Sequence, residues 1–342
     1  MRRSIKQAGI ASFALAGALL ATVHGQTVTP AASPTPVPAA PPVRLPLASL
    51  KPDAVIEAGR DRRIAVTPDA VWLTNAAAAT LIRIDPKTNM PATPVSAGPV
   101  GSGPCQPALA AFRSLWVALC SSNGLVRLNV TAETPAEKSP IALTVVVRKA
   151  GPLASGTGSV WMITDTAGTL ARIDPDTNAV VAEIALPAGV TAMAFGMGAL
   201  WVTSSSGDAL TRVNAATNVI EETIKVGRGP VSVAAGEGSV WTMNGGDSTV
   251  SRIDPKTNKV TETIKSGVAG TSGALVVGEG SVWLSANGMP LTRIDPAVNR
   301  MVQQFTGPGG GSLAIGLKSL WLGATPTAIW RIDPRRVEAT RK

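Results

Sequence analysis

The sequence predicts an all-β fold, a seven-bladed β-propeller whose blades are four-stranded antiparallel sheets. The first observation is a repeated unit, which is written most clearly by Gly236–Gly267. Seven tryptophans mark its copies at spacings of 44, 45, 40, 40, 42 and 38 residues. The second observation is that polar and apolar residues alternate within the unit, with many β-branched side chains, which is typical of strands. Such sheets bury both faces only when neighbours pack around an axis, so seven units indicate a closed ring.

Each unit is expected to contain four strands, named a to d from the axis outward. In the clearest unit they are residues 231–235, 239–243, 249–254 and 259–265. The turn from c to d reads DPKTN, in which Pro presets φ, Asp caps the backbone and Asn tolerates a left-handed conformation. The repeated aspartates are therefore predicted to be turn caps and not catalytic carboxylates: Asp85, Asp174, Asp254, Asp295 and Asp333.

A tryptophan on strand b and an arginine on strand c recur in every unit. The hairpin between these strands places the two side chains opposite each other on one face. A stacked Trp–Arg pair contributes roughly 0.5–2 kcal/mol, so we expect the pairs to hold the blades together. The predicted structural pairs are Trp72 with Arg83, Trp116 with Arg127, Trp161 with Arg172, Trp201 with Arg212, Trp241 with Arg252, Trp283 with Arg293, and Trp321 with Arg331.

The N-terminus carries the features of an export signal, which we assign to residues 1–25. Basic residues precede an apolar stretch of signal-peptide length, and small residues precede the expected cleavage after Gly25. Residues 26–46 contain seven prolines and are expected to form an extended linker. The propeller is assigned to residues 47–342. We therefore expect a periplasmic or secreted protein, which contacts a membrane only if the signal stays uncleaved.

Two segments can complete the last blade, because the chain ends soon after its Asp333-Pro334 dipeptide. One is the N-terminal segment Asp53–Gly59, which aligns with the d strand of the other units. The other is the C-terminal segment 337–340. We favour the N-terminal segment, because joining the two chain ends in one blade closes the ring.

Both cysteines fall in the second unit, which lacks the Asp-Pro turn and carries an insertion at residues 131–140. Cys105 lies at the start of strand a and Cys120 at the end of strand b, so the two should be cross-strand neighbours. An exported protein meets oxidising conditions. We therefore predict a Cys105–Cys120 disulfide and no metal site there, since two cysteines without histidine leave the ligand count short.

Histidine occurs only at position 24, inside the predicted signal, and tyrosine does not occur. This excludes the Ser-His-Asp triad, the Cys-His dyad and His-based zinc catalysis in the mature chain. We assign no catalytic residue, no metal and no cofactor, although Asp and Asn oxygens could hold Mg²⁺ or Ca²⁺ without a recognisable motif. The net charge of +9 is dispersed along the chain, so nucleic acid is not an expected partner.

In propellers the ligand face is usually the one built by the d–a and b–c loops around the central channel, so we expect the ligand face there. Its side chains are mixed polar with a positive bias, which suits a small anionic or polar ligand. The candidate residues are Arg60, Arg62, Asn75, Lys149, Asp165, Arg228, Asn244, Asp247 and Asn287.

The repeated pattern GSVWxxxxxxxTLxRIDPxTN resembles the YVTN-type and virginiamycin B lyase-like (streptogramin lyase-like) propeller repeats of bacterial proteins, from Asp53 to Lys342. The resemblance implies the propeller fold. The lyase chemistry of that family depends on a catalytic histidine and a Mg²⁺ site, and no residue here matches that histidine. We therefore favour an exported, monomeric, non-catalytic propeller that binds a protein, peptide or cell-envelope glycan. The alternative is an enzyme, a metal-assisted lyase or lactonase-like hydrolase that acts through carboxylates.

Overall fold

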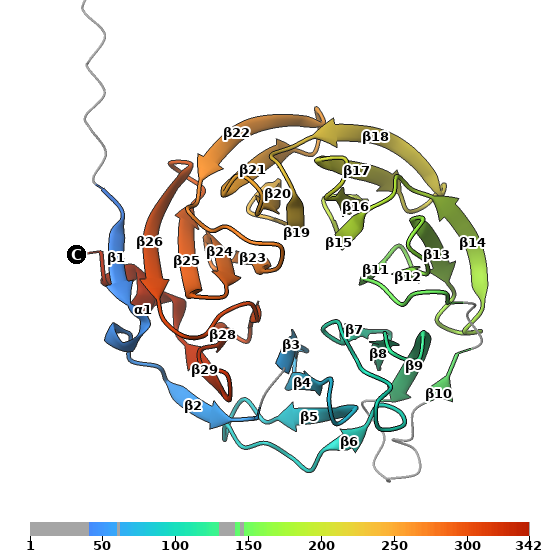
Figure 1. Cartoon of the computed structure of the whole chain (residues 1–342), viewed down its shortest axis with the longest axis horizontal. Helices are drawn as coiled ribbons and strands as arrows, with labels where there is room; N and C mark the ends of the chain where they lie inside the picture. The colour runs from blue at the N-terminus through green and yellow to red at the C-terminus, as the bar shows by residue number, and fades with distance from the viewer. Residues whose placement is uncertain (1–40, 60–61, 130–140, 144–146, 342) are drawn as a thin grey trace, which may run out of the picture. The chain divides into compact units, whose positions relative to one another are not determined.

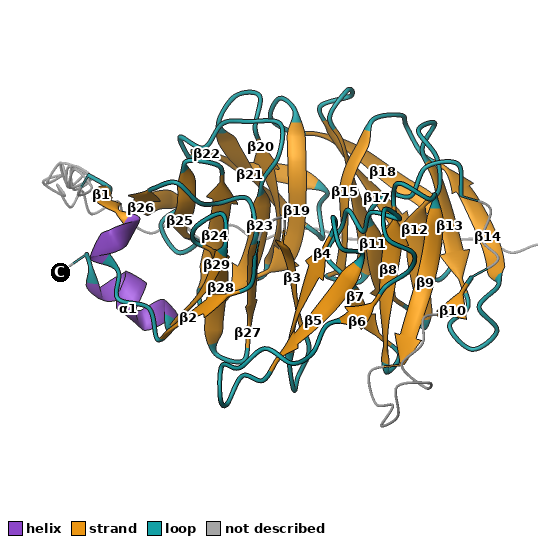
Figure 2. Cartoon of the chain, turned by 60° about the horizontal axis from the view of Figure 1, so that its bottom comes forward, coloured by secondary structure: helices purple, strands orange, loops and turns teal. Residues whose placement is uncertain are grey.

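The computed structural model describes residues 41–59, 62–129, 141–143 and 147–341. The predicted signal peptide, most of the predicted linker and Arg60 lie outside these residues. Within the described ranges the strands form seven sheets around a central axis, which confirms the seven-bladed β-propeller (Figure 1). The strands run between two faces where the loops gather (Figure 2). No helix of the described ranges is long and apolar enough to cross a membrane.

The first four blades follow one another along the chain, and each is written here from the axis outward. Blade 1 consists of β3 (Arg62–Val66), β4 (Val71–Asn75), β5 (Thr80–Ile84) and β6 (Val95–Ser96). Blade 2 consists of β7 (Leu109–Ala111), β8 (Ser114–Leu119), β9 (Gly124–Asn129) and β10 (Ile141–Ala142). Blade 3 consists of β11 (Leu153–Gly156), β12 (Ser159–Ile163), β13 (Thr169–Ile173) and β14 (Val180–Ala185). Blade 4 consists of β15 (Val190–Gly196), β16 (Ala199–Ser204), β17 (Ala209–Asn214) and β18 (Val219–Lys225).

The last three blades continue this order, and blade 7 takes its outer strand from the start of the chain. Blade 5 consists of β19 (Pro230–Gly236), β20 (Ser239–Asn244), β21 (Thr249–Asp254) and β22 (Lys259–Lys265). Blade 6 consists of β23 (Ala274–Gly278), β24 (Ser281–Ala286), β25 (Met289–Asp295) and β26 (Arg300–Thr306). Blade 7 consists of β27 (Leu313–Gly316), β28 (Ser319–Gly323), β29 (Ala328–Ile332) and β2 (Ala54–Glu57).

The ring closes through the N-terminal strand, as predicted. β2 pairs antiparallel with β29, from Ala54 opposite Arg331 to Glu57 opposite Ala328. The competing C-terminal segment forms a helix instead, α1 (Pro334–Ala339). Asp333 caps this helix by accepting a hydrogen bond from the backbone N–H of Arg335 at 2.9 Å, and Pro334 occupies its first position. The Asp-Pro pair that opens a turn in other units therefore starts a helix here.

The predicted linker is wrong at its C-terminal end. Val43–Pro46, which we assigned to it, form β1 and pair in parallel with β26 as the fifth strand of blade 6. Proline is tolerated in β1 because an edge strand needs only part of its N–H groups for pairing. The 3₁₀-helix η1 (Leu47–Ser49) follows, and Leu47 and Leu50 are buried in one core cluster with Phe305. The segment from β1 to β2 thus joins the outer edges of blades 6 and 7.

The tryptophans form the core between neighbouring blades. Six of them have no exposed surface, and Trp72 is 8% exposed. Each packs toward the blade that follows it: Trp241 of blade 5, for example, shares a cluster with Leu275 and Leu284 of blade 6. Truncating an indole buried in this way costs roughly 3–5 kcal/mol, so these side chains are a main source of cohesion between blades.

The glycine that ends strand a in most blades is needed for close approach of the next blade. A Cβ at Gly236 would lie 2.7 Å from Cγ1 of Val277, and one at Gly196 would lie 2.6 Å from Cβ of Ala235. The same glycine supplies an acceptor, since the indole N–H of Trp241 donates to the carbonyl oxygen of Gly236 at 3.1 Å. The first glycine of the repeated Gly-x-Gly-Ser-Val-Trp sequence is therefore a packing residue.

Candidate functional site

The repeated arginines join each blade to the next. The guanidinium of Arg252 lies 5.0 Å from the ring centre of Trp241, and its Nε donates to Oγ of Ser239 at 2.9 Å. Its Nη1 donates to the carbonyl oxygen of Pro296 at 2.9 Å and to Oδ1 of Asn299 at 2.7 Å, both in the c–d turn of blade 6. We call this arrangement the latch. It uses the Ser, Trp and Arg of one unit with the Pro and Asn of the next.

Most junctions repeat the Arg–Asn contact of the latch. In each case Nη1 of the arginine donates to Oδ1 of the asparagine. The distances are 3.0 Å for Arg127–Asn178, 3.0 Å for Arg172–Asn218 and 2.8 Å for Arg212–Asn258. Arg331 of blade 7 holds Asn89 of blade 1 at 3.1 Å, so the latch also crosses the ring closure. The latch asparagines have positive φ, for example 57° at Asn258, a conformation that Asn adopts more readily than most residues. Sequence reasoning assigned these asparagines to turns and missed their contact with the preceding blade.

Two junctions of the described structure lack this Arg–Asn contact. Arg293 of blade 6 donates to Oε1 of Glu338 at 2.9 Å, because α1 replaces the c–d turn of blade 7. Arg83 of blade 1 donates to Oδ2 of Asp69 at 3.2 Å, within its own blade. Six of the predicted Trp–Arg pairs stack in the described residues, at 4.9–5.8 Å. The pair Trp72–Arg83 is not among them, because Asp69 holds the guanidinium.

The repeated aspartates cap turns. Oδ1 of Asp254 accepts from the backbone N–H of Lys256 at 2.8 Å, and this hydrogen bond is the main cause that lowers the pKa of the Asp254 carboxyl. Backbone hydrogen bonds from Thr177 and Asp176 lower the pKa of Asp174 in the same way. Each aspartate of the described residues whose pKa departs from its ordinary value has it lowered. These groups are ionised acceptors at neutral pH, which is the opposite of what a general acid needs.

The predicted ligand-face residues divide into structural and free side chains. Asn244 is buried and donates from Nδ2 to the hydroxyls of Thr249 and Ser251, so it belongs to the interior of blade 5. The Asp165 carboxylate accepts hydrogen bonds from its own loop. Those from Thr169 are the largest causes that lower its pKa. Asn75 accepts from the backbone N–H of Ala78 at 3.2 Å.

The remaining predicted residues include two exposed side chains, Lys149 and Asn287. Arg62 pairs with Asn75 in the β3–β4 ladder, and Arg60 lies outside the described residues. The structure thus distributes the predicted set over several blades and does not gather it into one cluster.

Arg228 and Asp247 are two predicted residues that a hydrogen bond joins, at the junction of blades 4 and 5. Oδ2 of Asp247 accepts from the backbone N–H of Arg228 at 2.7 Å, and the Arg228 guanidinium donates to the carbonyl oxygen of Gly246. Asp208 of blade 4 reaches the same loop, since its Oδ1 accepts from the backbone N–H of Gly229 at 2.8 Å. This bond is the largest cause that lowers the pKa of Asp208, a residue that sequence reasoning missed.

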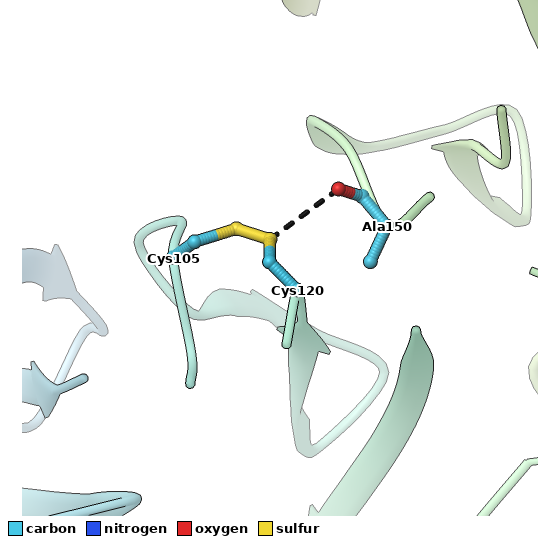
Figure 3. The surroundings of a disulfide bond; sticks show 3 residues. All are labelled: Cys105, Cys120 and Ala150. Carbon is cyan, nitrogen blue, oxygen red and sulfur yellow. Dashed lines mark hydrogen bonds between the residues drawn. A yellow bond between two sulfur atoms is a disulfide. The ribbon is translucent and has the colours of Figure 1, made fainter. Parts of the chain in front are cut away.

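The predicted disulfide Cys105–Cys120 is present on the same face, with its two Cα atoms 5.7 Å apart (Figure 3). The backbone N–H of Cys120 donates to the carbonyl oxygen of Gly103 at 2.9 Å, so the disulfide closes a loop already held by the backbone. Sγ of Cys120 also lies 3.3 Å from the carbonyl oxygen of Ala150 in the next d–a loop. The disulfide therefore fixes the loop that enters blade 2.

A hollow of about 260 Å³ opens on this face where blades 7 and 1 meet. Its lining includes four glycines, together with Arg63, Ser312, Thr325 and Thr327. The neighbouring glycine run brings two loops into close contact, because a Cβ at Gly309 would lie 2.1 Å from the carbonyl oxygen of Ala324. In the described part of the chain, no three His, Cys, Asp or Glu residues group as metal ligands.

Arg63 is the residue of this hollow that sequence reasoning missed. It occupies the strand-a position two residues before the one opposite the tryptophan. In the other blades this position holds a small residue or proline: Pro107, Pro152, Ala192, Ser232, Ala274 and Ser312. Comparison of the repeat units at this position would have singled out Arg63.

Comparisons with known proteins support the fold. No protein-family model matches the sequence, and no curated protein matches it. A streptogramin B lyase structure is similar with a TM-score of 0.67 and 15% identity, covering 81% of this chain and 96% of that one. A catalytically inactive virginiamycin B lyase from Staphylococcus aureus with quinupristin has a TM-score of 0.68 and 17% identity, covering 81% and 98%. A chain of the mitotic checkpoint complex has a TM-score of 0.70 and 12% identity, covering 84% and 96%. The chain therefore shares the seven-bladed fold of the virginiamycin B lyases.

Proposed function

We propose that this chain is an exported, non-catalytic β-propeller that binds a protein, peptide or cell-envelope ligand at the face of its d–a and b–c loops. The observation that carries the proposal is the hollow between blades 7 and 1, where an arginine and several hydroxyl side chains lie among glycines. Arg63 is exposed and departs from the repeat, so it is not required to build the blade. Its charge suits an anionic or polar group of a ligand.

The chemistry of the carboxylates supports a non-catalytic role. The aspartates with shifted pKa are held ionised by the hydrogen bonds that cap their turns. A general acid needs a pKa near the working pH, and a general base must be free to accept a proton. The chain also has no histidine after His24. These turn-capping aspartates are therefore better suited to structure than to proton transfer.

Similar structures provide precedents for binding by this fold. One belongs to a protein complex, and another contains quinupristin. A shared fold does not carry a shared ligand, because binding depends on the site and not on the scaffold. These precedents support only the general proposal that the face of this propeller contacts a partner.

The proposal is tested by capturing ligands from a cell-envelope extract on the immobilised protein and on two variants of it. One bait carries Arg63→Glu with Lys149→Glu on the proposed face, and the matched control carries Lys87→Glu with Lys256→Glu in c–d turns. Both pairs exchange exposed cations for anions, so they alter the net charge equally. We expect the control to retain its ligands and the face variant to lose them at least tenfold. Equal recovery by both variants would refute this location of the binding face.

The alternative, a metal-assisted lyase or lactonase-like hydrolase, is favoured by one observation, the fold similarity to lyases. Asp208 and Asp247 flank the same loop and are the carboxylates on which such a site would be built. Thermal unfolding with millimolar Mg²⁺ or Ca²⁺ separates the two functions. We expect no saturable rise in Tm, whereas a specific rise that Asp208→Asn abolishes would favour the enzyme.

A further inference from the structure

The turns that join strand a to strand b form a ring around the axis, at the end of the blades opposite the proposed ligand face (Figure 2). In blades 2 to 7 both central residues of this turn have positive φ. Blades 2 and 7 differ from the other four in the second residue, which is Arg113 at 56° and Lys318 at 55°. In blades 3 to 6 this residue is glycine: Gly158, Gly198, Gly238 and Gly280.

The two departing turns also carry bulky apolar residues at the first position. Phe112 precedes Arg113 with a φ of 52°, and Leu317 precedes Lys318 with a φ of 54°. Successive bulky side chains in the left-handed region are unfavourable, and glycine would form the same turn at lower cost. Strained residues of this kind gather at binding sites and switches. Formation of the turn therefore does not explain these four side chains.

The two turns lie on either side of blade 1. A Cβ at Gly316, directly before Leu317, would lie 2.6 Å from Cγ1 of Val66 in blade 1. On the other side, Trp72 of blade 1 shares a core cluster with Leu115 of blade 2. Blades 7, 1 and 2 are consecutive around the axis in Figure 1. The three turns are therefore neighbours in the ring.

The first residues of the three turns form an apolar inner row. The turn of blade 1 lies between Val66 and Val71, which are opposite each other in the ladder, and its central residues are Pro68 and Asp69. Strand a is the innermost strand, so the first turn residue lies nearer the axis than the second. The inner row is Leu317, Pro68 and Phe112. Phe112 is 38% exposed, and it is the one exposed aromatic side chain in the described ranges.

The second residues of the same turns form an outer row with a positive charge. Arg113 and Lys318 are exposed. Asp69 stands between them in the row, but its carboxylate pairs with the guanidinium of Arg83 at 3.2 Å. Because Asp69 and Arg83 offset each other, the row keeps the two positive charges of Arg113 and Lys318.

We propose that the apolar-basic sector, which consists of Leu317, Lys318, Pro68, Phe112 and Arg113, binds a short acidic and apolar segment of a partner protein. The apolar side chains of the segment cover the inner row, and its carboxylates meet the two cations of the outer row. Packed sheets stand about 10 Å apart, so the three turns span at most about 20 Å. An extended segment of about seven residues, alternately apolar and acidic, matches this length and both rows.

The rest of the ring favours a peptide over a lipid surface. Blades 5 and 6 carry Glu237 and Glu279 at the first turn position, and both side chains are exposed. Oε1 of Glu237 accepts from the backbone N–H of Gly280 at 3.1 Å, so these two turns touch each other. A flat anionic membrane over the ring would meet these carboxylates together with the cations. A peptide can lie on the apolar-basic sector alone.

The test uses the full chain and fluorescently labelled peptides of seven residues, followed by anisotropy at physiological ionic strength. The probe alternates leucine with aspartate. One control alternates leucine with lysine, which reverses the charge, and another alternates serine with aspartate, which removes the apolar side chains. We expect saturable binding of the probe and at least tenfold weaker binding of both controls.

Variants of the protein locate the binding. Arg113→Gly with Lys318→Gly gives both turns the glycine of the other blades and should weaken the probe at least tenfold. Its Tm should not fall by more than about 2 °C, because glycine relieves the left-handed strain. Phe112→Thr, which copies the first turn residue of blade 3, should weaken the probe at least fivefold. The matched control, Lys256→Gln with Lys259→Gln, removes two exposed cations from blade 5 and should keep the affinity within twofold.

Four results would each overturn the proposal. They are absence of saturable probe binding, equal binding of the serine–aspartate peptide, equal weakening by the blade 5 control, and a fall in Tm of more than about 2 °C with the two glycines. Vesicles of phosphatidylserine and phosphatidylcholine provide the lipid arm, and we expect no co-sedimentation of the parent chain. Co-sedimentation that the two glycines abolish would assign the sector to a membrane and would also overturn the proposal. Arg63→Glu, on the proposed ligand face, should keep the probe affinity within twofold, so failure of one site is distinguishable from failure of the other.

Discussion

The side-chain oxygen of Asn258 shows how one residue in a turn can link two blades. It accepts from Nη1 of Arg212 at 2.8 Å, while its φ of 57° shapes the turn itself. The sequence predicted the turn because the Asp-Pro-x-Thr-Asn pattern is local. It could not predict the contact with Arg212, because that contact spans 46 residues and a repeat shows only that both residues recur.

Substitution of Asn258 separates these two roles. Asn258→Gly keeps the positive φ and removes the acceptor, so we expect the free energy of unfolding to fall by about 1–3 kcal/mol. The matched control is Asn287→Gly, at an exposed loop residue. Urea unfolding followed by tryptophan fluorescence measures both. Equal effects of the two substitutions would contradict a latch role for Asn258.

The turn-capping aspartates predict how stability depends on pH. Hydrogen bonds from the backbone lower the pKa of Asp174 and Asp254 in the folded chain below the ordinary 3.8. A lowered folded-state pKa adds stability above the unfolded-state pKa, and this stability is lost as pH falls through the folded-state pKa. We expect Tm to fall steeply below about pH 4, and Asp254→Asn to make that fall shallower. A parallel pH profile for the variant would contradict the capping role.

The elements at the two chain ends were predicted less well than the blades between them. The β2 strand was predicted because Asp53–Gly59 aligns with the repeat. β1 was missed because the prolines around Val43–Pro46 favour an extended linker, and the β1–β26 pairing depends on an edge that only the assembled blade provides. α1 was missed because Asp-Pro is both a turn signal and a helix-start signal, and the residues that follow decide between them.

Two N-terminal truncations test the closing segment. Removal of residues 1–40 takes away only residues outside the described structure, and we expect Tm to stay unchanged. Removal of residues 1–58 also takes away β1, η1 and β2, exposing the cluster around Phe305 and Leu313. This truncation should lower Tm by more than 10 °C or prevent folding, because a whole strand and its core contacts are lost. Equal Tm for the two truncations would refute closure through β2.

The disulfide is a local element with a modest expected effect. Its cysteines are 15 residues apart, and a loop of that length predicts roughly 3 kcal/mol of stabilisation at most. Cys105→Ser with Cys120→Ser should therefore lower Tm by several degrees and leave the fold intact, as measured by circular dichroism. Thiol titration of the unfolded parent should find no free thiol. Two free thiols in protein recovered after export would contradict the predicted oxidation.

At the scale of the whole molecule, the structural residues and the proposed binding residue Arg63 occupy different positions of the repeat. Repeated residues such as Trp241 and Arg252 join neighbouring blades, and repeated aspartates such as Asp254 cap turns. Arg63 departs from the repeat, and its side chain is exposed. The sequence therefore predicts the scaffold well, because repetition averages out local variation. It predicts the candidate site poorly, since each departure occurs once and no second copy supports it.

A matched pair of arginine variants separates the two classes in one thermal unfolding experiment. Arg252→Gln removes the stacking on Trp241 and leaves the latch acceptors of blade 6 without their donor. Arg63→Gln removes the same charge from a position that the other blades fill with small residues or proline. We expect Tm to fall by about 5 °C or more for Arg252→Gln and by less than about 1 °C for Arg63→Gln. Equal shifts, or a larger fall for Arg63→Gln, would contradict the division between structural arginines and arginines available to a ligand.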